Sequence, residues 1–274
     1  MSARPLLRKD GRHRLRPNGD AAFRWFVAVL GSLILLLVLW MAWELFLQAR
    51  PTITGFGVRF LSGMRWNPVV GIFGAAPFIY GTVVTSLIAI LLAAPLGLAA
   101  AIYMAEIAPQ RLASVFGFLT ELLAAVPSVV YGLWGIFVVA PLMRTTIETW
   151  LTTYLGWLPI FAGPSFGIGI LPAGVVLSVM ILPTVAAVSR DVLNAVPETQ
   201  RHAMLALGAT RWETIAHAVL PMARPGITGA VMLALGRALG ETMAVLMLIG
   251  NRPQIVASIL QPGHTMAAVI AAEL

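Results

Sequence analysis

Long apolar segments alternate with short polar ones along most of the chain, and this pattern predicts membrane-spanning helices. About 20 apolar residues are needed for a helix to cross the hydrocarbon core. Five segments reach that length, at residues 25–46, 78–104, 117–140, 166–188 and 227–250. A sixth begins near Thr265, but ten residues are too few to cross as a helix. We predict an all-α polytopic transmembrane bundle with five full spans and a truncated sixth.

The composition supports a membrane protein and excludes several kinds of chemistry. Only 11% of the residues are charged, against about 25% in soluble domains. The chain has no cysteine, so it forms no disulfide and offers no thiolate. Its one lysine is Lys9, near the N-terminus, so it holds no Walker A loop. We therefore expect no cofactor or metal on this chain, and any ATP-driven step belongs to another chain.

The distribution of positive charge predicts the orientation. Residues 1–24 carry seven cationic side chains and precede the first apolar segment, as a basic cytoplasmic tail would. With the N-terminus inside, inner segments hold twelve Lys and Arg residues and outer segments hold five. A nucleic-acid-binding arm is the weaker alternative, because an apolar stretch follows at once. We interpret residues 25–46 as an uncleaved anchor helix and residues 78–274 as the transmembrane domain.

Two charges interrupt the predicted span at residues 227–250. Arg237 and Glu241 are its only charged residues, and positions four apart share one face of a continuous helix. An arginine at membrane depth costs about 2.5–3.5 kcal/mol on insertion scales, so it is kept where it meets a partner, a polar cavity or a permeant ion. The Arg237 guanidinium is always charged and matches the geometry of phosphate oxygens. The pattern favours an anion path; a permanent internal ion pair is the alternative.

Glu241 needs a separate explanation, because an ionised carboxylate repels an anion. It could neutralise Arg237 between transport events. It could instead accept a hydrogen bond from a protonated phosphate, which sulfate does not offer at neutral pH. Other polar residues on the predicted spans are further candidates for lining a pathway, namely Thr85, Ser86, Glu121, Ser128 and Tyr131.

The longest inner segment between spans, residues 189–222, has the pattern of two capped helices. Pro197 fits the opening turn of the first helix, and Gly208 fits the position just past its end. Thr210 begins a capping-box pattern for the second helix, which we expect to end at Leu220-Pro221. Such a compact loop can dock in the groove of a partner. The alternative is a simple connector.

This loop resembles the cytoplasmic loop of ABC-importer permeases. That family pattern is EAA, three residues, G, nine residues, then IxLP, and here His202 replaces the glutamate, Met204 the second alanine and Ala218 the isoleucine. The resemblance implies that the loop inserts into a cleft of an ATPase subunit. The positions expected to dock are His202, Ala203, Gly208, Leu220 and Pro221.

A closer resemblance, to the PstC-type permeases of phosphate importers, covers most of residues 78–251. It is carried by four stretches: YGT at 80–82 followed by Thr85-Ser86, ELLAAVPSVVYG at 121–132, GPSFGIGIL at 163–171, and the segment at 236–251. The family has six spans in this subunit, one more than the full spans found here. In that family Arg237 and Glu241 would lie on the substrate pathway.

The resemblance also implies a set of partners. These are a second permease subunit (PstA-like), two ATPase subunits (PstB-like) that bind ATP and Mg, and an extracytoplasmic phosphate-binding protein (PstS-like). The expected setting is the bacterial inner membrane, in contact with lipid and with no nucleic acid. The alternatives are a permease for molybdate or sulfate and an anion transporter that needs no ATPase. A membrane enzyme is disfavoured, since the spans hold no cluster of acids, bases and nucleophiles.

Overall fold

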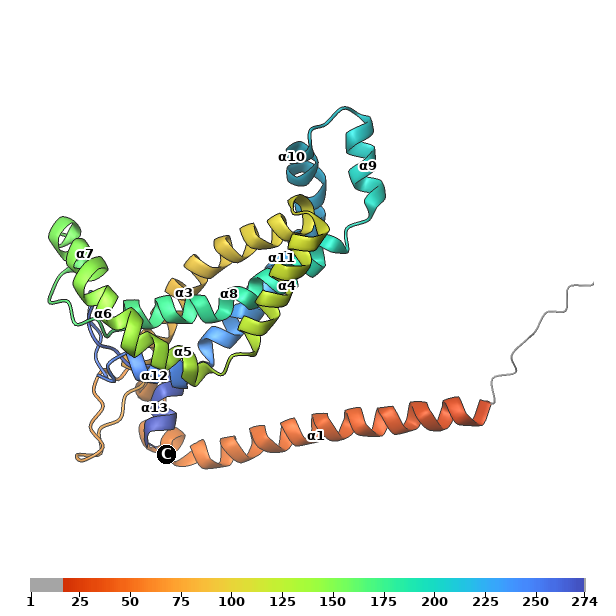
Figure 1. Cartoon of the computed structure of the whole chain (residues 1–274). Coiled ribbons are helices and arrows are strands. Elements are labelled where there is room, and N and C mark those ends of the chain that lie inside the picture. Colours follow the sequence, from red (N-terminus) through yellow and green to blue (C-terminus); the bar gives the residue numbers. More distant parts are fainter. Residues whose placement is uncertain (1–16, 274) are drawn as a thin grey trace, which may run out of the picture. The chain divides into compact units, whose positions relative to one another are not determined.

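The computed structural model describes residues 17–273, and the chain divides into two compact units, Met1–Val58 and Arg59–Leu274. The first unit contains helix α1, Pro17–Phe56 (Figure 1). This helix extends beyond the predicted segment 25–46 at both ends. Pro17 suits a first helical position, and polar residues after residue 46 end the apolar stretch without ending the helix. Most of the basic tail predicted at residues 1–24 lies outside the described residues.

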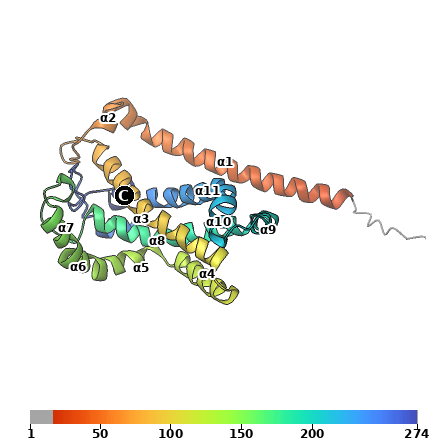
Figure 2. The same ribbon diagram turned by 90° about the horizontal axis from the view of Figure 1, so that it is seen from above.

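The second unit is helical throughout its length, apart from connecting loops. Figure 1 and Figure 2 show α9 (Glu198–Ala206) and α10 (Arg211–Thr214), the helices of the loop at residues 189–222 (the docking loop), at one end of this unit and α7 (Glu148–Leu155) at the other. Its elements are α2 (Arg59–Ser62), α3 (Ala76–Ile102), η1 (Tyr103–Ile107), α4 (Gln110–Ala125), α5 (Ser128–Trp134), η2 (Gly135–Val139), α6 (Ala140–Leu142), η3 (Met143–Ile147), α7 (Glu148–Leu155), η4 (Pro159–Phe161), α8 (Ile170–Asn194), α9 (Glu198–Ala206), α10 (Arg211–Thr214), η5 (Ile215–Val219), α11 (Leu220–Leu239), α12 (Met243–Leu248) and α13 (Met266–Glu273).

Five helical stretches among the described residues are long and apolar enough to cross a membrane. They are Gly19–Phe56, Ala76–Ile107, Ser128–Leu155, Ile170–Asn194 and Arg211–Leu239. The number of full spans and the helical fold class are as predicted. Where the sixth segment was expected, α13 is eight residues long.

The predicted span at 117–140 is wrong as a single helix. Val126 and Pro127 have extended backbone, with ψ of 129° and 140°, and they separate α4 from α5. A residue before proline disfavours the helical region, and the proline has no N–H to continue the ladder. The membrane-crossing stretch instead starts at Ser128 and runs on to Leu155 through two π-helical turns.

The predicted span at 227–250 is also wrong as a single helix. It ends at Leu239, and three residues separate α11 from α12. Gly240 is a poor helix former and caps α11, its N–H donating to the Gly236 carbonyl at 3.2 Å. Thr242 then turns its hydroxyl to the Gly240 carbonyl at 3.3 Å, a local bond that competes with the helical ladder. An apolar pattern alone does not reveal such a break.

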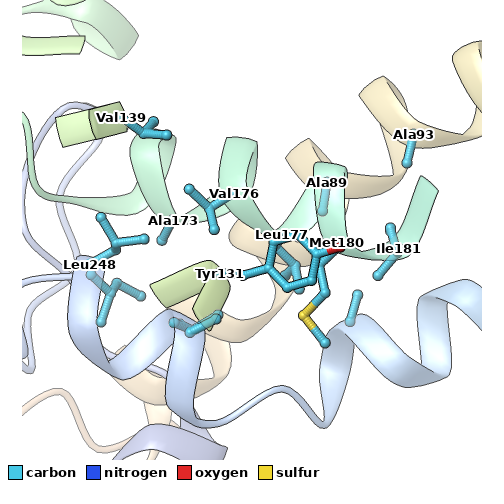
Figure 3. Packing of buried hydrophobic residues seen from close by; sticks show 14 of the residues in the cluster. Ala89, Ala93, Tyr131, Val139, Ala173, Val176, Leu177, Met180, Ile181 and Leu248 are labelled. Atoms are coloured by element: carbon cyan, nitrogen blue, oxygen red, sulfur yellow. The ribbon is translucent and has the colours of Figure 1, made fainter. Parts of the chain in front are cut away.

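The main core lies where α8 crosses α3, α5 and α12. Buried residues such as Val176, Leu177 and Ile181 of α8 pack there with Leu248 of α12 (Figure 3). Close approach of α3 to α8 depends on glycine. A Cβ on Gly97 would lie 2.9 Å from the Val185 Cβ, inside van der Waals contact. Small residues at such crossings are how membrane helices gain packing energy.

Candidate functional site

Arg237 lies in the last turn of α11 and is half-buried. Its Nη1 donates a hydrogen bond to the Thr184 Oγ1 of α8 at 3.3 Å. Tyr131 of α5 lies near the guanidinium. The site thus brings together side chains of α5, α8 and α11, which are far apart in sequence. A guanidinium held by a neutral hydroxyl keeps its full positive charge for an anion.

Glu241 lies in the break between α11 and α12, so it does not share a helical face with Arg237. Its Oε1 accepts the N–H of Ala244 at 3.2 Å, at the beginning of α12. Within residues 17–273 no ion pair joins Glu241 to Arg237. The permanent internal ion pair considered from the sequence is therefore wrong for this structure. The carboxylate caps a helix, and no hydrogen bond to its other oxygen is found in the described part of the chain.

Other polar residues on the spans mostly donate hydrogen bonds to backbone carbonyls nearby in the sequence. The Thr85 hydroxyl donates to the Gly81 carbonyl at 2.7 Å, and the Tyr131 hydroxyl to the Leu123 carbonyl at 2.8 Å. Ser86 is buried, and its hydroxyl has no hydrogen-bond partner in the described residues. Glu121 is exposed and lies 3.6 Å from Arg190 at its carboxylate. Of these candidates, Tyr131 is the one that lies near Arg237 in the described part of the chain.

The first half of the docking loop forms as the sequence indicates. Helix α9 begins after Pro197, and Gly208 follows its end with a φ of +84°. The N–H of Gly208 bonds to the Leu205 carbonyl at 3.0 Å, and the N–H of Ala209 bonds to the Met204 carbonyl at 3.1 Å. These bonds satisfy carbonyls that a helix end leaves unpaired.

The second half differs from the prediction. The capping box of Thr210 and Glu213 is present, with both reciprocal bonds made. The helix does not end at Leu220-Pro221, however, but continues through the π-turn η5 into α11. Pro221 lacks the N–H that would bond to the carbonyl of His217, and the wider π-turn accommodates that loss. The docking loop is therefore continuous with the helix that carries Arg237.

The expected docking residues lie along this loop, away from Arg237. His202, Ala203, Gly208 and Pro221 are exposed, and Leu220 is half-buried. The His202 Nε2 lies 3.5 Å from the Glu198 carboxylate one turn earlier. Exposed positions on α9 are available to a partner subunit.

Three polar residues, Thr184, Arg201 and Glu106, have structural roles that the sequence analysis did not identify. Thr184 holds Arg237, and its only sequence signal is a hydroxyl that follows Pro183 inside a span. Arg201 had counted as one inner cation among twelve, yet it pairs with Glu106 at 2.7 Å. Nothing in the spacing of residues 106 and 201 indicates that they meet.

Comparison with known proteins agrees with this architecture. Residues 93–272 match the family described as binding-protein-dependent transport system inner membrane component. A phosphate transport system permease protein PstC from Mesorhizobium japonicum is 43% identical over 100% of this chain and 85% of the relative. PstC proteins of Xylella fastidiosa (strain Temecula1) and Pasteurella multocida are each 40% identical, over 95% and 92% of this chain and 82% and 78% of theirs.

The matches cover both the helical core and the docking loop, and they confirm the resemblance drawn from the sequence. A transport permease subunit is not itself an enzyme, and its multiple apolar helices make this one a multi-pass membrane protein. The chain belongs to the binding-protein-dependent transport system inner membrane components and, among them, to the PstC permeases.

Proposed function

We propose that this chain is the permease subunit of an ATP-driven phosphate importer in the bacterial inner membrane, with its N-terminus in the cytoplasm. The observation that carries the proposal is the half-buried Arg237, which no carboxylate neutralises among the described residues. A charge kept at that depth needs a partner. The relatives are phosphate transport system permeases by name, and phosphate matches the guanidinium in charge and geometry.

Arg237 attracts phosphate and releases it quickly. The guanidinium offers two parallel N–H donors to phosphate oxygens, and the Thr184 hydroxyl can turn from Arg237 toward the same anion. The unbonded oxygen of Glu241 can accept a hydrogen bond from the hydroxyl group of monohydrogen or dihydrogen phosphate, a donor that sulfate lacks at neutral pH. Arg237 thus attracts the anion and Glu241 selects phosphate over sulfate, which explains why an acidic residue lies beside an anion path.

The partners that this function requires are the ones the family resemblance implies. They are a PstA-like second permease, two PstB-like ATPase subunits and a PstS-like phosphate-binding protein outside. Lys9 is the only lysine, which supports placing ATP and Mg on the ATPase subunits. The exposed helix α9 is the surface on which we place the contact with an ATPase subunit.

The test is uptake of labelled phosphate by cells that lack their own permease and carry this chain with its partner genes. We expect ATP-dependent uptake that excess unlabelled phosphate abolishes and excess sulfate or molybdate leaves unchanged. Competition by sulfate or molybdate would instead indicate a permease for another oxyanion. Uptake without an ATPase subunit co-purifying would contradict the importer class.

A further inference from the structure

Helix α9 buries little apolar surface, and Met204 is its one half-buried apolar residue. None of its residues is buried, and Leu205 on its surface is 49% exposed. A cavity of about 300 Å³ opens beside it, lined on the facing side by Arg211, Thr214 and Ile215. Burial of apolar surface therefore contributes little to holding α9 against the spans.

Arg201 is the polar residue of α9 whose side chain is mostly buried. Arg201 is 19% exposed at its side chain, and its Nη2 lies 2.7 Å from the Oε1 of Glu106, whose side chain is 9% exposed. The Nε of Arg201 also donates to the Glu106 Oε2 at 3.4 Å. The two groups form a forked pair of mostly buried side chains at the wall of the same cavity, where each satisfies the other.

The same guanidinium also holds the end of α8. Its Nη2 donates to the Leu193 carbonyl at 2.9 Å and its Nη1 to the Val196 carbonyl at 2.6 Å. Leu193 lies in the last turn of α8, where its carbonyl also accepts the N–H of Val196 at 3.2 Å and a positive charge is favourable. Arg201 thus joins α9 to two spans at once, because Glu106 lies in η1 at the end of α3.

One of these two spans, α8, carries Thr184 of the candidate site, and the other, α3, packs against α8. Thr184, which holds Arg237, lies nine residues before Leu193 on α8, or about 14 Å along the axis at 1.5 Å per residue. α3 and α8 pack without a gap around Gly97. A displacement of α9 that pulls on Arg201 is therefore passed to the helix that positions the Arg237 partner.

We propose that Arg201, through Glu106 and the end of α8, is the positioning residue that transmits movement of the docking helix to the phosphate pathway. The proposal rests on the proposed function, in which an ATPase subunit grips this loop. This positioning role of Arg201 differs from a purely structural one. A purely structural role would lower the amount of folded protein and leave the number of ATP molecules used per phosphate unchanged.

The test measures the number of ATP molecules hydrolysed per phosphate transported by the complete importer in proteoliposomes. For Arg201→Met we expect this ratio to rise by about twofold to thirtyfold, the factors that correspond to the 0.5–2 kcal/mol by which mutations alter coupling within a protein. Arg111→Met is the matched control, since Arg111 is exposed on α4 and makes no ion pair in the described residues. Arg201→Lys should give an intermediate ratio, because an ammonium keeps the charge and loses the fork.

Replacing the Arg201–Glu106 ion pair with a covalent bridge tests the same connection between α9 and η1 while keeping the two elements joined. The natural chain has no cysteine, so Glu106→Cys combined with Arg201→Cys offers the only two thiols on it. A bifunctional methanethiosulfonate reagent that bridges these thiols should return the ratio toward that of the unaltered importer, and reduction should raise it again. This variant also decides the question if Arg201→Met fails to fold.

Two results would overturn the proposal. One is an Arg201→Met importer with the same ratio as the Arg111→Met control. The other is a ratio that bridging of the two thiols leaves unchanged. Failure of the underlying function would look different, because the unaltered importer would then show no ATP-dependent uptake.

Discussion

Gly208, at the turn between the two docking helices, offers a perturbation whose energetic cost can be worked out. Its φ is +84°, a region that residues with a Cβ rarely adopt. A Cβ placed there would meet no atom within 4 Å, so Gly208→Ala adds no clash. The cost is the backbone strain of a left-handed residue, about 1–2 kcal/mol. Gly208→Val costs more, because its branched Cβ resists this region further.

This strain should appear as weaker docking of the ATPase subunit. Each 1.4 kcal/mol changes an equilibrium constant tenfold, so this strain lowers the population of the native turn by a factor of about 5 to 30 relative to other conformations of the turn. If the ATPase subunit binds only the native turn, its apparent Kd rises by that factor as the alternative turn becomes dominant. The assay is a titration of ATPase subunit against the purified permease pair in detergent, for Gly208→Ala and Gly208→Val.

The control is Gly31→Ala, which adds the same methyl group to α1 where nothing lies within 4 Å. Alanine is the better helix former there, so the Kd should stay unchanged. If Gly208→Val binds the ATPase as tightly as the unaltered chain at equal membrane levels, the reasoning that joins this turn to docking is refuted.

Three further changes test the packing and the pathway. Gly97→Leu should lower the temperature at which the detergent-solubilised protein loses its fold, because overpacking costs about 1–3 kcal/mol; an unchanged midpoint would contradict the close α3–α8 contact. Thr184→Val should raise the KM for phosphate uptake about tenfold, the order expected for a hydrogen bond to a charged group, and Thr184→Ser should restore it; equal KM values for valine and serine would contradict that role. Glu241→Gln keeps an oxygen for the Ala244 N–H, so uptake should persist while sulfate becomes a competitor; unchanged selectivity would remove Glu241 from substrate choice.

The features that could be predicted from the sequence are those that depend on residues close together along the chain. Apolar length gives the number of full spans, and short-range rules give the glycine turn at Gly208 and the capping box of Thr210 and Glu213. In each case the residues that interact are within a few positions of one another. Their energies depend little on the rest of the fold.

The features that were missed depend on contacts between distant segments or on breaks inside apolar runs. Hydropathy does not distinguish one long helix from two, so we predicted continuous helices across the breaks before Ser128 and after Leu239. Glu241, on the same predicted helix, was the partner considered for Arg237 in the alternative interpretation, and the structure instead pairs Arg237 with Thr184 on another helix. Pairing across helices is set by packing, which a single sequence does not record.

The most direct test of the central claim is labelled phosphate uptake by Arg237→Gln, at a membrane level equal to that of the unaltered chain. Loss of a charged contact of this kind costs about 2 kcal/mol or more, so uptake should fall at least about thirtyfold. ATPase docking should remain, because the docking loop does not contact Arg237. Normal phosphate uptake by this variant would contradict the account, since the anion would then cross without the guanidinium.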